Sequence, residues 1–354
     1  MNLQRPPRLS LAQRGFTLAE LMIAITIGLL IMAGMTTLFV KNSRAQAELE
    51  KSNRQIENGR FAAQLLSADL ASAGFYGEFD PTVLASPAAP PDPCSLDVAD
   101  LRAALPLHVQ GYDNAGPDLL SCVDDVRAGT DIVVVRHTAT CVAGIGDCDA
   151  VSAGGPFFQA SLCNNPSELG SGDTANFYNL EITDGALSRH QRNCTDPAVI
   201  RRYLTHIYFV ANNDNPGDAI PTLKRAELGE SSGGVLAWRI APLVEGIDNL
   251  QLEYGIDDVG GVADGRADVY KAAPGGCGTP ACAVESWRKV VNVKLNLLAR
   301  NTEPTSGYTD AKAYQLGRNA DGSVNRVAPA GDAYKRHVFQ ATVVLPNPAG
   351  RNTP

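Results

Sequence analysis

The chain has 354 residues, a formal net charge of -8 at pH 7 and 44% hydrophobic residues, so it is long enough to bury at least one substantial core. Its 33 glycines and 22 prolines exceed what a helical bundle tolerates, which favours a domain of strands and loops. The acidic balance argues against nucleic-acid binding through a basic patch.

The N-terminal region predicts a membrane anchor. Residues 1–15 contain arginines and no acid, and residues 21–40 contain no charge at all. The apolar run is long enough to span a bilayer, and its basic flank places the N-terminus in the cytoplasm. We therefore expect the remainder of the chain to be exported.

The cysteines lead to the same conclusion independently. There are eight, all beyond the apolar run, and their even number suits an oxidising compartment. Among the connectivities that they allow, we select the four short-range pairs, Cys94 with Cys122, Cys141 with Cys148, Cys163 with Cys194, and Cys277 with Cys282.

Glu20 stands at the threshold of the apolar run, where an isolated charge costs several kcal/mol. An ordinary secretory signal has a shorter apolar region with a small-residue cleavage site after it, and this run has no such site. An uncleaved signal anchor explains every feature of the segment except Glu20 and the residues just before it.

Those residues read "RGFTLAE", which closely resembles the class III signal of type IV prepilins and pseudopilins. The resemblance implies cleavage after Gly15 by a membrane-embedded aspartic peptidase, methylation of the new Phe16 amine, and retention of the apolar segment. Glu20 would then be the fifth mature residue, whose carboxylate approaches the N-terminal amine of a neighbouring subunit. Pairing with an ammonium group would relieve the cost of the charge.

A helix is predicted to continue beyond residue 40 and to end before Gly74, a credible C-terminal cap. From Phe16 to Ala73 it would be about 87 Å long. Apolar residues recur on one face of its second half, at Leu49, Ile56, Ala63, Leu66, Leu70 and Ala73. We expect this face to pack on a sheet; a free coiled coil is the alternative, disfavoured by Gly59 and by the short repeat.

Strand signals concentrate in the C-terminal half. Residues 75 to about 195 read as loops rich in Pro, Gly, Asp and Cys, with one clear strand at 131–137. The stronger signals are 198–212, 222–228, 235–257, 287–300 and 337–347. Within 235–257, residues 243–250 could instead form a turn or a short helix. The lack of long helical patterns between strands predicts an antiparallel sheet and argues against a parallel α/β fold.

Four blocks extend the resemblance to the PilW class of minor type IV pilins: "LLSADLASAGFYG", "LVEGIDNLQLEYGID", "VVNVKLNLLARN" and "KRHVFQATVVLPN". The J-class pseudopilins of type II secretion share part of this pattern. The implied fold is α+β and type IV pilin-like, a long N-terminal hydrophobic helix packed on an antiparallel β-sheet domain with long disulfide-bearing loops. Its expected parts are a cleaved leader (1–15), a transmembrane or filament-core helix (16–40), an amphipathic helix (41–74) and a periplasmic globular domain (75–354).

The chain departs from many major pilins in one respect. Its apolar run has no proline near the middle, only Gly28 and Gly34, so partial melting of the helix during assembly is not expected from the sequence.

Few motifs suggest chemistry. "GESSG" (229–233) matches the spacing of a serine-hydrolase elbow at Ser231, but the sequence after it predicts a strand where that motif needs a helix. His137 with Cys141 and Cys148, or Cys277 with Cys282, could be imagined as metal ligands, but none has the paired spacing of a zinc site. The five histidines are scattered, and we interpret each as a surface or core residue.

One acidic loop is the remaining candidate for a metal. Asp257, Asp258, Asp264 and Asp268 lie in a Gly-rich stretch, and oxygen ligands suit calcium. The regular spacing of a calcium loop is absent, so a solvated turn is the favoured interpretation. We expect no cofactor.

The resemblance implies an interaction protein and no enzyme. We expect a single-pass protein of the inner membrane, periplasmic until assembly places it in an extracellular pilus, where it would join other minor pilins to prime assembly near the tip. The implied partners are other minor pilins, the major pilin, prepilin peptidase, the inner-membrane assembly platform and a tip adhesin. A type II secretion pseudopilin of the J class is the main alternative, and a membrane-anchored hydrolase using Ser231 is a weaker one.

Overall fold

The computed structural model describes residues 15–231, 235–257 and 263–352. The chain divides into two compact units, residues 1–51 and 52–354, and we call the second unit the head. Helix α1 (Leu18–Ser72) begins in the first unit and ends in the head.

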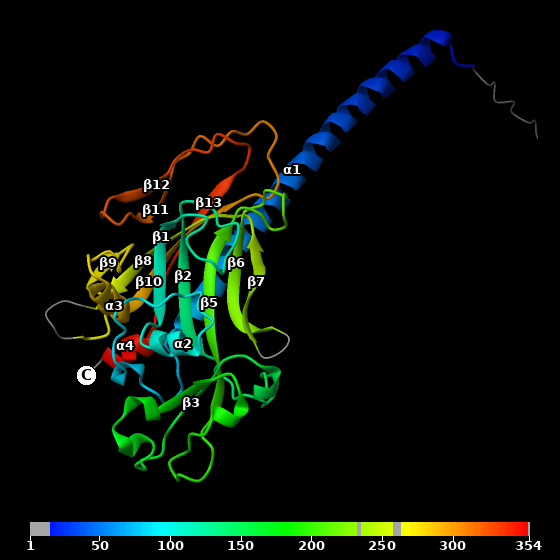
Figure 1. Cartoon of the computed structure of the whole chain (residues 1–354). Coiled ribbons are helices and arrows are strands. Elements are labelled where there is room, and N and C mark those ends of the chain that lie inside the picture. Colours follow the sequence, from blue (N-terminus) through cyan, green and yellow to red (C-terminus); the bar gives the residue numbers. More distant parts are fainter. Residues whose placement is uncertain (1–14, 232–234, 258–262, 353–354) are drawn as a thin grey trace, which may run out of the picture. The chain divides into compact units, whose positions relative to one another are not determined.

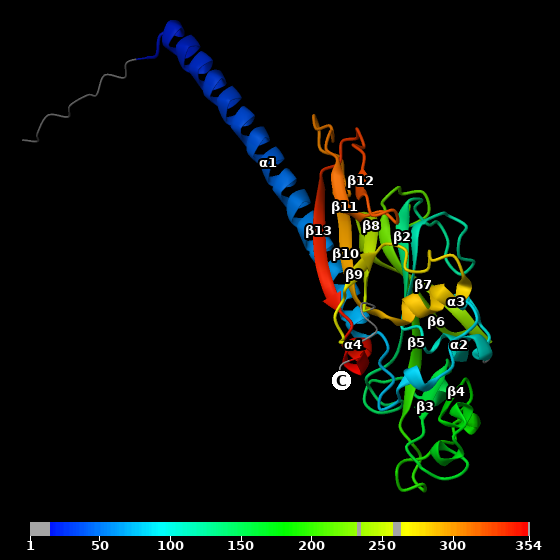
Figure 2. The same cartoon turned by 90° about the vertical axis from the view of Figure 1, so that its left-hand side faces the viewer.

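The head contains two principal antiparallel sheets (Figure 1). The seven-stranded sheet consists of β1 (Val109–Ala115), β2 (Thr130–Thr138), β3 (Phe157–Ala160), β4 (Tyr178–Glu181), β5 (Ile200–Ala211), β6 (Thr222–Ser231) and β7 (Val235–Glu245). The four-stranded sheet has the order β13 (Arg336–Val344), β10 (Val290–Arg300), β8 (Ile247–Ile256) and β9 (Val269–Lys271). A separate hairpin joins β11 (Tyr314–Arg318) and β12 (Val324–Val327), beside β10 and β13 in Figure 2.

The other helices of the head are short. They are α2 (Val98–Ala104), α3 (Pro280–Arg288) and α4 (Pro346–Asn352), with single 3₁₀ turns at Pro81–Val83, Val151–Ala153, Leu169–Ser171, Thr174–Asn176 and Asp184–Ala186.

Strand β5 connects the two regions of the larger sheet. Residues 203–208 pair with β2 and residues 206–211 pair with β6, whereas residues 200–202 pair with β3. Figure 1 shows β3 at the far end of β5, away from the paired region of β2, β6 and β7. The loops that carry β3 and β4 therefore extend from one end of an otherwise regular sheet.

Gly246 is the point where the chain leaves one sheet and enters the other. It separates β7 from β8 by a single residue with φ of 76°, a region that favours glycine. An added Cβ would lie 2.7 Å from the Arg300 carbonyl oxygen, and the Gly246 carbonyl accepts the Arg300 N–H at 2.7 Å. The expected alternative of a short helix at 243–250 is therefore wrong, because both flanking segments are paired strands.

The second half of α1 packs on the head through a narrow face. Gln55, Gly59, Ala62, Leu66 and Leu70 are buried, and the last three belong to the central core with side chains of both sheets. This spacing of three and four residues is that of one helix face. The predicted seven-residue stripe was only partly right, because Leu49 is exposed and Ile56 and Ala63 are half-buried.

Gly59 does not interrupt the helix. A Cβ at this position would lie 2.1 Å from a ring carbon of Phe339 on β13, so the missing side chain lets the aromatic ring approach the helix backbone. Four residues earlier, one turn before Gly59, the Gln55 amide donates to the carbonyls of Ala299 and Lys335, both at 2.8 Å. These contacts fix α1 to the strand pair β10–β13.

The C-terminal end of α1 is closed by helix α4. Gly74 has φ of 72°, as expected for a residue that ends a helix, and its N–H donates to the carbonyl of Arg136 at 2.9 Å. The Asn347 amide donates to the Ala73 carbonyl at 3.1 Å, and the Arg351 guanidinium donates to the Gly74 carbonyl at 2.8 Å. The last carbonyls of the helix therefore receive donors from the chain's C-terminal segment.

The strand predictions were confirmed where the signals were strongest. The segments predicted at 131–137, 198–212, 222–228 and 337–347 correspond to β2, β5, β6 and β13. The prediction for 287–300 placed its start too early, because Trp287 and Arg288 belong to α3. The region expected to be mostly loop also contains β1, β3, β4 and α2.

Candidate functional site

The described part of the N-terminal unit presents an apolar surface. Every residue from 15 to 47 is exposed, including Leu30 at 73% and Phe39 at 74%. By length and composition, α1 is able to cross a membrane. Such a helix needs either lipid or the apolar faces of other helices around it.

Glu20 forms a capping box with Thr17 at the start of this helix. The Glu20 Oε2 accepts the Thr17 backbone N–H at 2.9 Å and the Thr17 hydroxyl at 2.8 Å. The Thr17 Oγ1 accepts the Glu20 N–H at 3.3 Å. This is the reciprocal arrangement that satisfies two otherwise unpaired donors of a helix N-terminus.

From the sequence, we expected the partner of Glu20 in a neighbouring subunit and did not identify Thr17. The spacing of a threonine and a glutamate three residues later is the usual signal for a capping box, and it is present at positions 17 and 20. Both contacts use Oε2, and the second carboxylate oxygen accepts no hydrogen bond within the described part of the chain.

The expected cleavage position lies directly before α1. Gly15 and Phe16 precede the helix, Phe16 is 90% exposed, and a Cβ on Gly15 would meet no atom within 4 Å among the described residues. The peptide between these residues lies in an extended, exposed segment that suits access by a peptidase. Cleavage and methylation here stay predictions.

Two family models match the chain in the places that these features indicate. Residues 11–36 match the model described as the prokaryotic N-terminal methylation motif, and residues 207–347 match the model described as Type IV Pilus-assembly protein W. These two matches support a PilW-class type IV pilin with a prepilin-type signal. No curated protein and no solved structure gave a match.

A PilW-class pilin with this N-terminus is a single-pass protein of the inner membrane with a soluble C-terminal domain. The PilW match runs from the middle of β5 to the beginning of α4 and includes the whole four-stranded sheet. It therefore contains β10 and β13, against which Gln55 and Gly59 of α1 pack, and it leaves residues 37–206 outside both matches. PilW-class pilins are structural components of the pilus, which gives no support for an enzyme.

The head carries four disulfides, Cys94–Cys122, Cys141–Cys148, Cys163–Cys194 and Cys277–Cys282. They are the four pairs selected from the sequence. Three of them lie before residue 207, outside the PilW match, in the region where loops outnumber strands. Cross-links suit such a region because it has fewer apolar contacts to hold it.

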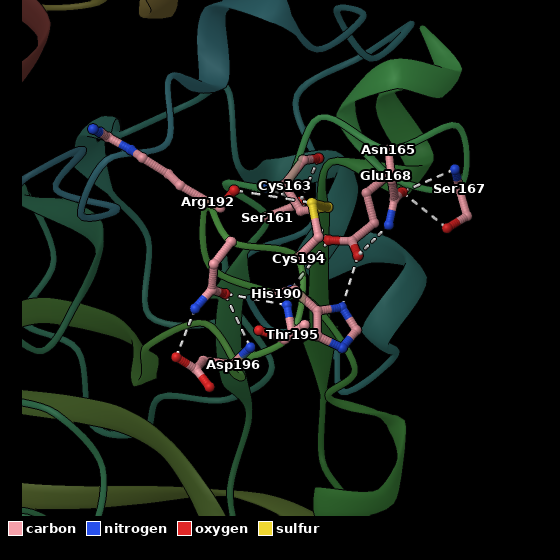
Figure 3. The surroundings of a disulfide bond; sticks show 11 residues. Ser161, Cys163, Asn165, Ser167, Glu168, His190, Arg192, Cys194, Thr195 and Asp196 are labelled. Atoms are coloured by element: carbon pink, nitrogen blue, oxygen red, sulfur yellow. Dashed lines mark hydrogen bonds and ion pairs between the residues drawn. A yellow bond between two sulfur atoms is a disulfide. The ribbon is translucent and has the colours of Figure 1, made fainter.

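Figure 3 shows how polar side chains support the Cys163–Cys194 disulfide. Glu168 is buried and accepts the Ser161 hydroxyl at 2.5 Å, the His190 N–H at 3.1 Å and the His190 Nδ1 at 2.7 Å. Burial acts to raise the pKa of Glu168, but these hydrogen bonds from Ser161 and His190 outweigh it and lower the pKa. The loops on both sides of the disulfide are therefore joined by a histidine–carboxylate contact as well as by the sulfur bond.

The Ser231 motif has no catalytic context in the structure. Ser231 ends β6, and β7 begins at Val235, its antiparallel partner. A nucleophile elbow needs a strand followed by a helix, and two paired strands stand here instead. Residues 232–234 of the connection lie outside the described residues.

The acidic loop does not assemble a cluster among its described residues. Asp258 lies outside them. Asp257 is buried and accepts the Gly265 N–H at 2.8 Å, whereas Asp264 and Asp268 are exposed. Asp257 thus supports the backbone of the loop, a role that the interpretation as a solvated turn missed.

A different group of potential ligands was missed entirely. In the described part of the chain, Asp69, His137 and His206 form the one group of three such side chains whose ligand atoms lie together, within 4.8 Å of one another. They come from α1, β2 and β5, so no local spacing in the sequence connects them. Cys141 and Cys148, considered with His137 from the sequence, form a disulfide instead.

Proposed function

We propose that this minor pilin assembles with other minor pilins into a complex that primes pilus assembly, near the tip of the filament. The observation that carries the proposal is the start of α1, where Glu20 stands at the first turn of an exposed apolar helix. Once such a helix leaves the lipid, its apolar surface is covered favourably by the helices of other pilins. The second oxygen of Glu20 would meet the N-terminal amine of the adjacent subunit.

The head supports a place at the end of the filament. Residues 75–199 add disulfide-bearing loops to the sheets of the PilW region, and the loops that carry β3 and β4 extend from one end of β5. A head of this size is accommodated more easily at the tip than in a repeating shaft. The proposed partners are the other minor pilins, the major pilin, the assembly platform and a tip adhesin, after processing by prepilin peptidase. This role requires no bond chemistry from the head.

A complementation experiment tests the role of Glu20. A deletion strain should regain surface pili with the wild-type chain and with Glu50→Ala, which removes an exposed acid of the same helix beyond the apolar run. Glu20→Ala should be processed normally yet fail to restore pili, because processing depends on Gly15 and the apolar run. Gly15→Val should accumulate as the unprocessed form on a gel.

Normal piliation by Glu20→Ala would refute the proposed ion pair. Labelling the head with gold on intact cells tests the position, and labels should lie at filament ends. Labels along the shaft, or a deletion strain with normal pili and defective protein secretion, would refute the tip-priming role. The second of these outcomes would favour a type II secretion pseudopilin of the J class.

A further inference from the structure

The group formed by Asp69, His137 and His206 lies where α1 meets the larger sheet. Asp69 Oδ1 is 2.9 Å from His137 Nε2, and Asp69 Oδ2 is 2.9 Å from His206 Nδ1. The pairing of His137 with Leu204 puts His137 diagonally across from His206 on adjacent strands, so both rings share one face of the sheet. All three side chains are at least 87% buried.

Each ring also faces an acceptor on its other side. The His137 Nδ1 is 2.9 Å from the Thr138 carbonyl oxygen, which can only accept, so this nitrogen carries the hydrogen. The His206 Nε2 is 3.6 Å from a carboxylate oxygen of Glu227. In the neutral form, His137 then directs a lone pair toward Asp69, and His206 does the same when its hydrogen is on Nε2, the nitrogen that faces Glu227.

A nitrogen lone pair and an ionised carboxylate oxygen repel each other at 2.9 Å, so a positive charge must lie between the two atoms. Two additional protons, one on each imidazole, would supply it, and so would one divalent cation. A protonated Asp69 would satisfy only one ring, because a carboxylic acid has a single hydrogen and the two rings face different oxygens. The nearby Arg225 guanidinium is bound to Glu227 at 2.8 Å and does not contact Asp69 by any hydrogen bond in the described part of the chain.

We propose that Asp69, His137 and His206 bind a divalent transition-metal ion of the zinc type, which fastens the end of α1 to β2 and β5. Two imidazoles and a carboxylate are a common ligand set for such ions. The outer contacts fit as well, because metal-binding histidines donate their other N–H to a carbonyl or a carboxylate, as the partners Thr138 and Glu227 allow.

The geometry requires an adjustment of the side chains. Bond lengths of about 2.0 to 2.1 Å around tetrahedral zinc place its ligand atoms about 3.3 Å apart. The two separations of 2.9 Å would have to open by a few tenths of an ångström, and the two imidazole nitrogens, which lie within 4.8 Å of each other, would have to take the same spacing.

Tyr208 provides a second observation at this place. Its hydroxyl is buried without a hydrogen-bond partner among the described residues. Its ring lies 6.2 Å from the ring of His206 in a T-shaped arrangement, so this hydroxyl belongs to the surroundings of the cluster. An ion with three protein ligands keeps a position for water, and a water is the partner that this hydroxyl lacks.

Metal binding by the mature full-length chain in detergent tests the proposal directly. The chain, stripped with chelator and dialysed against zinc chloride at pH 7.5, should retain one zinc per chain and melt several degrees higher than the stripped form. Cobalt should give the visible absorption of a four-coordinate site. His137→Gln with His206→Gln should abolish both signals, whereas His190→Gln, which alters the histidine–carboxylate pair beside the Cys163–Cys194 disulfide, should retain them.

An X-ray absorption spectrum of the wild-type zinc form needs no variant and should show two imidazole ligands. The proposal is refuted if the folded wild-type chain takes up no zinc, if the spectrum shows fewer than two imidazoles, or if the double variant binds as well as the wild type. The proposal is also contradicted if the zinc-free wild-type chain loses stability as the pH rises from 6 to 8, because protons on the histidines would then hold this group together. Piliation does not enter this test, so its outcome is separate from that of the proposed function.

Discussion

Replacing Arg336 should destabilise the head more than any single surface change. Its side chain is 4% exposed and contacts three carboxylates, Asp248 at 2.7 Å, Asp310 at 2.8 Å and Asp332 at 2.7 Å. These residues come from β8, from the loop before β11 and from the segment before β13. The guanidinium therefore joins the four-stranded sheet to the loops around the β11–β12 hairpin.

The magnitude follows from what the substitution leaves behind. In Arg336→Gln, Asp310 is fully buried and keeps only neutral contacts such as the Tyr314 hydroxyl at 3.0 Å, whereas Asp248 keeps Arg127 at 2.8 Å. Removing one partner of a buried ion pair costs about 3 to 5 kcal/mol. At about 2 to 4 °C for each kcal/mol in a large domain, the melting temperature should fall by about 10 °C.

Thermal and urea unfolding of the mature chain in detergent, followed by tryptophan fluorescence, measures this loss. Arg318→Gln is the matched control, because Arg318 is exposed and donates to the Gly322 carbonyl at 3.0 Å. We expect the control to stay within about 0.5 kcal/mol of the wild type. If Arg336→Gln and Arg318→Gln unfold at the same urea concentration, the network contributes nothing and the reasoning is wrong.

Further predictions concern acid, disulfides and calcium. Hydrogen bonding to Arg336 holds the pKa of Asp332 below its usual range. Folding thus favours the ionised form, and this contribution is present above about pH 4 and is lost as the pH falls further, so acid titration should destabilise the wild type more steeply than Arg336→Gln. Replacing Cys94 and Cys122 together by serine opens a loop with a sequence separation of 28 and should cost about 3 to 4 kcal/mol in urea unfolding; free thiols at most cysteine positions in periplasmic protein would contradict the oxidised head. Calcium and chelator should give the same melting temperature, and a rise in calcium that Asp264→Ala abolishes would reinstate the acidic loop as a metal site.

The features predicted from the sequence were those with local signals. The apolar run and the β-branched segments of β2 and β5 are each visible in one contiguous stretch of the sequence. Strands β3 and β4 have only four residues each and owe their existence to pairing with β5 and with each other, which no short window contains. Propensity alone therefore read that region as loop.

Side-chain contacts between distant segments explain the remaining errors. Gly59 reads as a helix breaker until the ring of Phe339 is placed against it. Similarly, Asp69, His137 and His206 each look like an isolated polar residue in an apolar pattern, and only the packing of α1 on two adjacent strands brings them together. The available signal in the sequence was Asp69, a carboxylate on the side of the helix that was expected to dock on a sheet.

The capping box at Glu20 lowers the cost of holding this carboxylate at the membrane in a subunit that has not yet been assembled. With Oε2 bound to Thr17, the carboxylate is not a bare charge that must find a neighbour at once. In the assembly proposed above, the N-terminus of another subunit would add a bond to the second oxygen without breaking the first. Unassembled subunits would then be tolerated in the bilayer, and a growing filament would draw on that reserve.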